Sequence, residues 1–277
     1  MLRILTLALT LAAPALAQSS AQRVQWVQPL APFRILGNVH HVGSQGLSAY
    51  LVTGPQGHVL IDGGLPESAP QIAASIRALG FRLADVKYIL INHSHYDHAG
   101  GLAELKRLTG ARLIATAGEK PDLEAGRTLG RPELEGFPAV TVDRIVEDGE
   151  QVRLGPVTLT AIASPGHTRG GVSWLTSAGG KTVLFATSLT VAGQPLVGDR
   201  DYPQAAADFT RTFARLRRVR ADVFLNFHPE FFDLAGKRRA LLAGNAMAFV
   251  DPGETRRQID RAEADFKAEL ARQQAAR

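Results

Sequence analysis

A cluster of histidines with one aspartate, directly after an apolar run, constrains this chain more than any other feature. Residues 88–91 (Tyr-Ile-Leu-Ile) form a continuous apolar run, which is typical of a strand buried on both faces of a sheet. The next residues include four side chains that bind metal ions in proteins: His93, His95, Asp97 and His98. Bringing these side chains together lowers the free energy of the folded chain little unless a cation binds between them. The pattern therefore predicts a metal site at the end of this strand.

We expect this segment to be an extended chain followed by a turn. Alternation by two places His93, His95 and Asp97 on one side of an extended chain. The glycines in residues 99–101 permit a sharp bend, which would bring His98 to the same place. Loops beyond the carboxyl ends of buried strands are also where α/β folds place their sites.

Two further histidines follow predicted strands. His167 comes after the run at residues 157–162, behind a Pro-Gly turn, and His228 comes after residues 223–226. Either residue alone would more often be structural, but the repeated placement at strand ends favours metal ligation. The other histidines have no such setting and are excluded as ligands: His40, His41 and His58.

Asp62 ends another apolar run, at residues 59–61, and precedes two glycines. One interpretation makes it a helix-entry residue near an N-cap. The other makes it a buried carboxylate that orients a ligand histidine through the second ring nitrogen. The sequence favours neither.

The composition limits the ligand chemistry and the partners. The chain has no cysteine, which excludes a disulfide, a thiolate metal site and a cysteine nucleophile. Imidazole and carboxylate ligands without thiolate suit zinc first, then iron, manganese, cobalt or nickel. The formal net charge is +5, but the basic residues are dispersed and no aromatic-interleaved basic motif occurs. We therefore expect no nucleic-acid partner.

The first 17 residues have the pattern of an export signal. They contain a basic Arg3, an apolar run at residues 4–11 and the small-x-small triplet Ala15-Leu16-Ala17. The run is too short to span a bilayer, which needs about 20 residues. We predict a signal peptide over residues 1–17, export, and no membrane span.

Strand and helix patterns alternate in both halves of the remaining chain, which predicts an α/β layered fold. No low-complexity linker separates the halves, so we expect one domain over residues 18–277. The predicted strands are residues 49–52, 59–61, 88–91, 112–115, 157–162, 172–176, 183–186 and 223–226. The predicted helices are residues 66–79, 101–108, 121–129, 203–217 and the tail from residue 253.

Together, His93-x-His95-x-Asp97-His98 and the later His167 and His228 resemble the metallo-β-lactamase superfamily. The resemblance implies a four-layer αβ/βα sandwich with its metals at one edge. It also implies two zinc ions. The first would be held by His93, His95 and His167, and the second by Asp97, His98 and His228.

The residues after the run at 183–186 indicate a subclass. Thioesterases and lactonases of the superfamily have a metal-bridging aspartate there, whereas this chain has Thr187-Ser188-Leu189-Thr190. The first β-lactamase subclass uses a cysteine, which this chain lacks. The chain is most similar to subclass B3, and this resemblance implies that Ser188 and Thr190 bind the substrate carboxylate. Thr187 stands where many relatives have aspartate.

The expected function is hydrolysis of β-lactam rings by a hydroxide that two zinc ions activate, because zinc lowers the pKa of bound water to about 7. Asp97 would bind the second zinc and orient the hydroxide. The resemblance also implies a periplasmic enzyme, and we expect a monomer that acts on a small molecule. Alternatives are a lactonase or thioesterase of the same fold, and an exported zinc-binding protein without activity. A basic polyanion-binding module has only the net charge in its favour.

Overall fold

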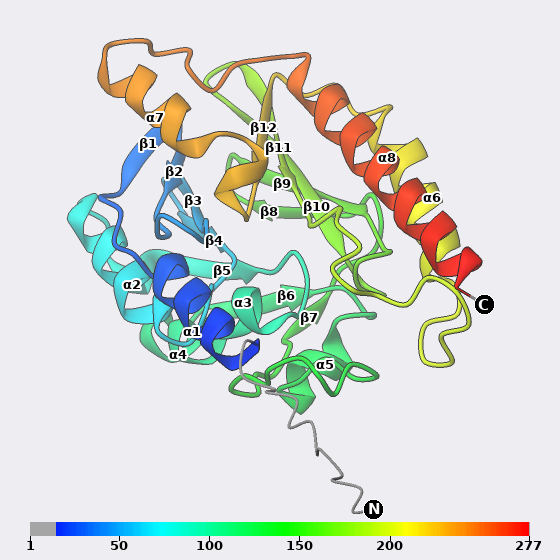
Figure 1. Ribbon diagram of the computed structural model, residues 1–277. Helices are drawn as coiled ribbons and strands as arrows, with labels where there is room; N and C mark the ends of the chain where they lie inside the picture. The colour runs from blue at the N-terminus through cyan, green and yellow to red at the C-terminus, as the bar shows by residue number, and fades with distance from the viewer. Residues whose placement is uncertain (1–14, 277) are drawn as a thin grey trace, which may run out of the picture.

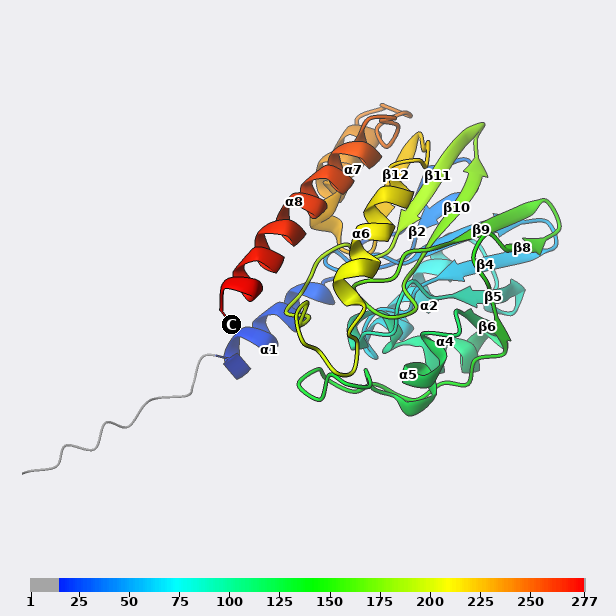
Figure 2. The same cartoon turned by 90° about the vertical axis from the view of Figure 1, so that its right-hand side faces the viewer.

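Two β-sheets face each other in the middle of the molecule, and helices cover their outer sides (Figure 1). The computed structural model describes residues 15–276. Helices α2 and α4 lie against the first sheet, whereas α6 and α8 lie against the second, as the rotated view also shows (Figure 2). These layers confirm the predicted αβ/βα sandwich. Within the described residues, no helix is both long and apolar enough to cross a bilayer.

The first sheet is built from the N-terminal half of the chain, in the order β1-β2-β3-β4-β5-β6-β7. Neighbours from β1 to β4 are antiparallel, and neighbours from β4 to β7 are parallel. The strands are β1 (Phe33–Leu36), β2 (Val39–His41), β3 (Tyr50–Gly54), β4 (Gly57–Ile61), β5 (Val86–Leu90), β6 (Arg112–Ala115) and β7 (Arg144–Ile145).

The second sheet has the order β12-β11-β10-β9-β8. All its neighbours are antiparallel except β11 and β12, which are parallel. The strands are β8 (Gln151–Leu154), β9 (Val157–Ala163), β10 (Val172–Ala178), β11 (Lys181–Ala186) and β12 (Val223–Asn226).

The helices connect the strands or close the outer layers. The α-helices are α1 (Ala15–Trp26), α2 (Ser68–Ala78), α3 (Tyr96–Ala99), α4 (Leu102–Thr109), α5 (Lys120–Ala125), α6 (Ala205–Leu216), α7 (Leu234–Leu242) and α8 (Glu254–Ala275). The 3-10 helices are η1 (Leu83–Asp85) and η2 (Pro229–Phe231).

The alternation of side chains along β4 and β5 divides the interior into two cores. Val59 and Ile61 of β4 and Leu90 of β5 face the second sheet and join the large core between the sheets. Leu60 and Ile89 face the opposite way and pack in the core under α2 and α4. Both strands are therefore apolar on both faces, as the continuous apolar run at residues 88–91 predicted.

Hydrogen bonds join the two sheets at the edge where β5 and β12 end. The Tyr50 hydroxyl donates to the Asn226 carbonyl over 2.5 Å, and the Trp174 indole donates to the Ile91 carbonyl over 3.3 Å. The Val172 amide donates to the Asn92 carbonyl over 2.9 Å. These bonds fix the ends of β5 and β12 relative to each other.

Each predicted strand and helix has a counterpart in the structure, with bounds that differ by a few residues. The helix expected at residues 121–129 ends at Ala125, because Gly126 adopts a left-handed φ of 67°. The sequence prediction missed β1, β2, β7, β8, α1, α3, η1 and η2, and it gave no bounds for α7. The predicted signal peptide lies mainly outside the described residues. Both it and the single domain at residues 18–277 remain predictions.

Replacing Tyr50 by phenylalanine removes the hydroxyl and leaves the buried ring in place. We expect the free energy of unfolding to fall by about 1 kcal/mol, because the Asn226 carbonyl loses a buried donor. Urea unfolding followed by tryptophan fluorescence measures this change. The half-buried Tyr88 provides the matched control, and Tyr88→Phe should change stability by less than about 0.5 kcal/mol. Equal effects of the two substitutions would contradict the proposed role of this bond.

Candidate metal centre

The structure brings all six predicted ligand side chains together at the edge where β5, β9 and β12 end. They form two groups in which the nitrogen and oxygen atoms of each group lie within 4.8 Å of one another. One group is His93, His95 and His167, and the other is Asp97, His98 and His228. The histidines that the sequence excluded lie outside both groups: His40 and His41 in β2 and His58 in β4.

The local path of the chain differs from the expected extended segment. Helix α3 begins at Tyr96, directly after His95, so Asp97 and His98 lie on its first turn. The predicted bend at residues 99–101 is therefore wrong, because the chain turns three residues earlier. The glycines serve close packing instead, since a Cβ on Gly101 would lie 2.3 Å from the Gly63 carbonyl oxygen. The helical turn still brings Asp97 and His98 together.

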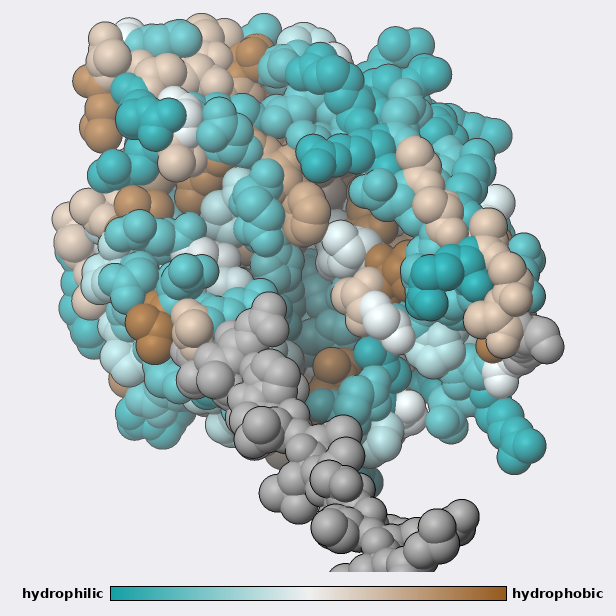
Figure 3. Space-filling view, in the orientation of Figure 1, coloured by the Kyte–Doolittle hydropathy of each residue, from teal (hydrophilic) through white to brown (hydrophobic). Residues whose placement is uncertain are grey.

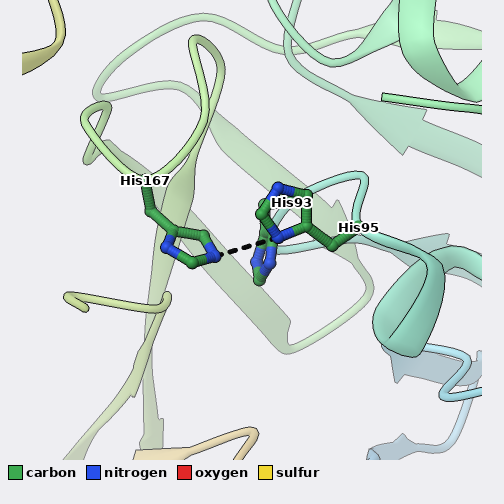
Figure 4. A group of neighbouring side chains, drawn as sticks. All are labelled: His93, His95 and His167. Carbon is green, nitrogen blue, oxygen red and sulfur yellow. Dashed lines mark hydrogen bonds between the residues drawn. The ribbon is translucent and has the colours of Figure 1, made fainter. Parts of the chain in front are cut away.

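The first group consists of three buried imidazoles that face one another (Figure 4). Nε2 of His167 lies 3.0 Å from Nδ1 of His95, and the His93 ring centroid is 4.6 Å from that of His167. Nδ1 of His167 donates to the Thr190 carbonyl over 2.7 Å, which leaves the lone pair of Nε2 directed at the group. Gly166 permits this approach with a φ of +138°, as the Pro-Gly turn predicted.

His93 is oriented by its neighbour Asn92, a residue that the sequence prediction missed. Nδ1 of His93 donates to the Asn92 side-chain carbonyl, which also accepts a 3.2 Å bond from the Thr187 hydroxyl. Asn92 and Thr187 are both fully buried. Thr187 thus continues a neutral hydrogen-bond chain behind the first group.

The second group is held from behind by Asp62. Nδ1 of His98 donates to the Asp62 carboxylate over 2.7 Å, so Nε2 of His98 faces the group, 3.1 Å from Nε2 of His228. One carboxylate oxygen of Asp97 lies 3.5 Å from Nε2 of His98 and 3.4 Å from Nε2 of His228. The two imidazoles and the carboxylate thus share one small volume.

Asp62 therefore orients His98, one of the predicted ligands, and the helix-entry interpretation is wrong, since the N-cap of α2 is Glu67. Its carboxylate also accepts bonds from the backbone and side-chain amides of Asn92, and its side chain caps no helix. The residue has a φ of 72°, a left-handed conformation that non-glycine residues seldom adopt. A strained backbone at a buried carboxylate is typical of a functional site.

Glu119, which the sequence prediction also missed, ties the loops of the first group together. Its fully buried carboxylate accepts bonds from the Ser94 amide over 2.7 Å, the Gly170 amide over 3.1 Å and the Thr168 hydroxyl. Ser94 stands between His93 and His95, and Thr168 follows His167. One side chain thus fixes the spacing of two ligand loops that are far apart in the sequence.

Burial and mutual contact shift the protonation of the cluster. Burial holds the pKa of His93 and of His95 well below the ordinary value, and the neighbouring histidines lower both further. Burial also lowers the pKa of His167 to about 4. The first group therefore presents neutral imidazoles at neutral pH, which is the form that binds metal ions.

The second group has opposite charges in contact. Burial opposes the ionisation of Asp97, but the attraction of His98 and His228 lowers its pKa below the ordinary value. Burial also opposes charge on His98, yet the carboxylates of Asp97 and Asp62 raise its pKa. A positive charge beside Asp97 is therefore favourable, and a metal cation would supply it in place of the proton.

The unpaired nitrogens test whether these residues fit metal ions. Nε2 of His93 and Nε2 of His95 are buried and have no hydrogen-bond partner among the described residues. In His93 this nitrogen faces the group, because Nδ1 bonds to Asn92, whereas in His95 the nitrogen that faces His167 is Nδ1. Leaving such an atom unpaired costs about 1–3 kcal/mol. Imidazole nitrogens with outer hydrogen bonds and an inward lone pair are the usual arrangement of metal ligands. The residues present fit metal ions.

A pocket of about 260 Å³ opens over both groups. Ser188 and Thr190 line it, and their hydroxyl oxygens lie 3.1 Å apart. Three aromatic side chains that the sequence prediction missed form the walls: Trp26, Tyr96 and Phe231. The Trp26 ring lies 5.9 Å from the ring of His228, which places α1 at the mouth of the pocket.

The family model of the metallo-beta-lactamase superfamily matches residues 45–228, which contain all six of these side chains. The chain belongs to the metallo-β-lactamase superfamily. This confirms the resemblance that the histidine motif carried. The family and its histidine-rich groups indicate that this centre binds metal ions.

Solved structures with a similar fold cover nearly the whole chain. A metallo-β-lactamase of Cronobacter sakazakii with a HARLDQ motif is 43% identical, with a TM-score of 0.89, over 92% of this chain and 99% of its own. BJP-1, a subclass B3 metallo-β-lactamase of Bradyrhizobium japonicum, is 40% identical, with a TM-score of 0.86, over 91% and 98%. The HARLDQ motif of the Cronobacter protein corresponds to HSHYDH in this chain, which has His95 and His98 in place of arginine and glutamine.

Curated relatives align over a shorter part. A hydroxyacylglutathione hydrolase of Bradyrhizobium sp. (strain ORS 278) is 32% identical over 154 residues, which are 56% of this chain and 52% of the relative. A second, from Pseudomonas aeruginosa (strain LESB58), is 34% identical over 113 residues, or 41% of this chain and 36% of the relative. The chain spans about half or less of the length of these relatives.

Replacing Asp62 by asparagine keeps the size of the side chain and removes the charge behind His98. We expect the affinity for zinc to fall by about 10–100-fold, which is the usual effect of losing such a partner. Competition with a chromophoric chelator measures the affinity. Asp85→Asn, in η1 and away from the centre, should leave it unchanged. If the folded Asp62→Asn protein binds zinc as tightly as the wild type, Asp62 serves only to form the turn and does not orient His98.

Proposed function

We propose that this protein is a zinc-dependent hydrolase that opens the ring of β-lactam antibiotics. The observation that carries this proposal is the pair of three-ligand groups, side by side at the base of one pocket. Three protein ligands leave a metal ion with an open position, which is characteristic of catalytic rather than structural zinc sites. An exported zinc-binding protein without activity explains neither this open arrangement nor the substrate-sized pocket above it.

The residues fit two zinc ions. His93, His95 and His167 would hold the first, and Asp97, His98 and His228 would hold the second. Nitrogen and oxygen donors without thiolate suit zinc. Bound zinc lowers the pKa of a coordinated water molecule and polarises a carbonyl oxygen.

Ring opening adds one water molecule across the lactam C–N bond. The water oxygen bonds to the carbonyl carbon, the C–N bond breaks, and the nitrogen takes up a proton. The ionised Asp97 lies at the second group and accepts a hydrogen bond from the attacking water, which directs the water oxygen towards the ring. Asp97 is thus both a metal ligand and the residue that orients the nucleophile.

Ser188 and Thr190 lie beside the first group and supply hydroxyl donors. β-Lactam antibiotics have a carboxylate near the ring, and two hydroxyls 3.1 Å apart suit one carboxylate. Binding this carboxylate holds the lactam carbonyl over the metal groups. The two residues are therefore proposed to bind substrate.

The absence of a carboxylate after β11 favours a β-lactamase over a thioesterase or lactonase. At the place where those enzymes bridge the metals, this chain has Thr187, whose hydroxyl bonds to Asn92 instead. The curated hydroxyacylglutathione hydrolases align with about half of the chain, whereas the subclass B3 structure aligns with 91% of it at higher identity. The thioesterase remains the alternative that the experiment below tests.

The setting that we propose for this enzyme is the periplasm. The pattern at residues 1–17 supports export, and β-lactam antibiotics act outside the cytoplasmic membrane. We propose that the enzyme is a monomer, with no nucleic-acid partner and a small molecule as substrate.

Removing the metal ions should abolish hydrolysis of β-lactams. We expect the zinc-loaded protein to open a carbapenem and a cephalosporin, followed by the loss of lactam absorbance. A chelator should stop the reaction and added zinc should restore it, whereas serine-directed inhibitors should have no effect.

A homoserine lactone and a glutathione thioester serve as the competing substrates in the same assay. Turnover of either one alone would contradict the β-lactamase proposal and leave the family assignment intact. Tight zinc uptake without turnover of any substrate would instead favour a zinc-binding protein. His93→Ala provides the control for activity that does not depend on the centre.

Replacing Ser188 by alanine should weaken substrate binding more than the chemical step. We expect KM to rise about tenfold with kcat nearly unchanged, because one hydrogen bond to a charged group is lost. Steady-state kinetics on one cephalosporin measure both values. Ser177→Ala, on the exposed part of β10, is the matched control. An equal fall in kcat and in kcat/KM would contradict a role in ground-state binding.

A further inference from the structure

A second and larger cavity, of about 410 Å³, lies between α8 and the segment at residues 189–193. Its interior is mainly apolar. Apolar side chains also gather beside the central hollow of this face, on the side where α8 lies (Figure 3). Its apolar lining includes Leu189, Val191, Phe224, Phe231, Ala262 and Phe266.

This apolar cavity adjoins the metal pocket. Thr190, Ala192 and Phe231 line both spaces, and the Phe231 ring lies 6.1 Å from the ring of His228. The metal pocket alone has about 260 Å³, which is below the roughly 300–1,000 Å³ of pockets that enclose drug-sized ligands. A substituent on a β-lactam nucleus over the metal groups therefore extends beyond this pocket, and the adjoining cavity lies on one side of it.

The wall between the two spaces is held in place. Arg131, which is 9% exposed, donates to the Gln194 side chain over 2.8 Å and to the Ala192 carbonyl over 3.4 Å. Ala192 has a left-handed φ of 46°, a conformation that surrounding contacts must hold in a non-glycine residue. A fixed wall with an apolar face distinguishes substituents by shape and polarity.

We propose that this apolar cavity binds the substituent of the β-lactam substrate, so that the enzyme prefers rings with a bulky, uncharged aromatic or branched aliphatic group. The proposal rests on the proposed function. Phenyl rings on several sides suit an apolar group, because burial removes its surface from water. The exposed Arg261 and Asp265 at the mouth have opposite charges, and the third charged lining residue, Glu269, is paired with Arg272 over 2.6 Å. The entrance therefore favours no net charge on the substituent.

Two cephalosporins with the same nucleus and carboxylate, one with a methyl and one with a benzyl substituent, test this preference. We expect the zinc-loaded enzyme to have a KM about tenfold lower for the benzyl compound, with similar kcat. Ala262→Trp fills the cavity from α8 and should remove this difference without changing the KM for the methyl compound. Ala264→Trp, on the exposed side of the same helix, should leave both values unchanged.

The outcomes separate this inference from the function on which it rests. Equal KM values for the two compounds, or equal effects of the two tryptophan substitutions, would overturn the subsite while leaving β-lactam hydrolysis intact. Failure to hydrolyse either compound would overturn the proposed function itself. If Ala262→Trp does not fold, Gln258→Phe fills the same cavity from one turn earlier and should give the same selective loss.

Discussion

The convergence of buried imidazole lone pairs is the constraint on which the rest of this structure depends. Outward hydrogen bonds from His93, His98 and His167 to Asn92, Asp62 and the Thr190 carbonyl fix the inward direction of the second ring nitrogen. Buried lone pairs that face one another cannot satisfy each other, so the arrangement is costly without a cation. The loops therefore hold these side chains in an arrangement that favours the binding of metal ions.

Both halves of the sandwich are needed to build this arrangement. The first sheet supplies the motif from His93 to His98, whereas His167 and His228 follow strands of the second sheet. The contacts that join the halves lie beside the centre, as the bonds of Tyr50 and Trp174 show. Glu119 then links the ligand loops directly. The same few contacts thus stabilise the interface between the sheets and fix the positions of the six side chains.

The sequence predicted which six side chains converge because strand periodicity and residue chemistry agree there. Apolar runs locate strand ends, and histidine is uncommon enough that its repetition after three strands is informative. The local path of the backbone was less predictable, since nothing in the sequence showed that α3 would begin at Tyr96. Asn92 and Glu119 escaped prediction because their roles arise from partners up to 95 residues away, Thr187 and Gly170 among them. Such contacts have no local pattern.

The ligand set alone does not decide the substrate. Similar histidines serve hydrolases of different specificity on this fold, and in the Cronobacter protein two of these positions have other residues. Under the proposed function, discrimination must therefore come from the walls of the site, which α1, α3 and the loops after β11 and β12 provide. Thr187 fits this view, because its hydroxyl forms a neutral bond to Asn92 where a carboxylate would place a further negative charge beside the two groups. Both halves of the sandwich contribute to these walls, so the substrate preference that we propose depends on the same joined halves as the ligand set.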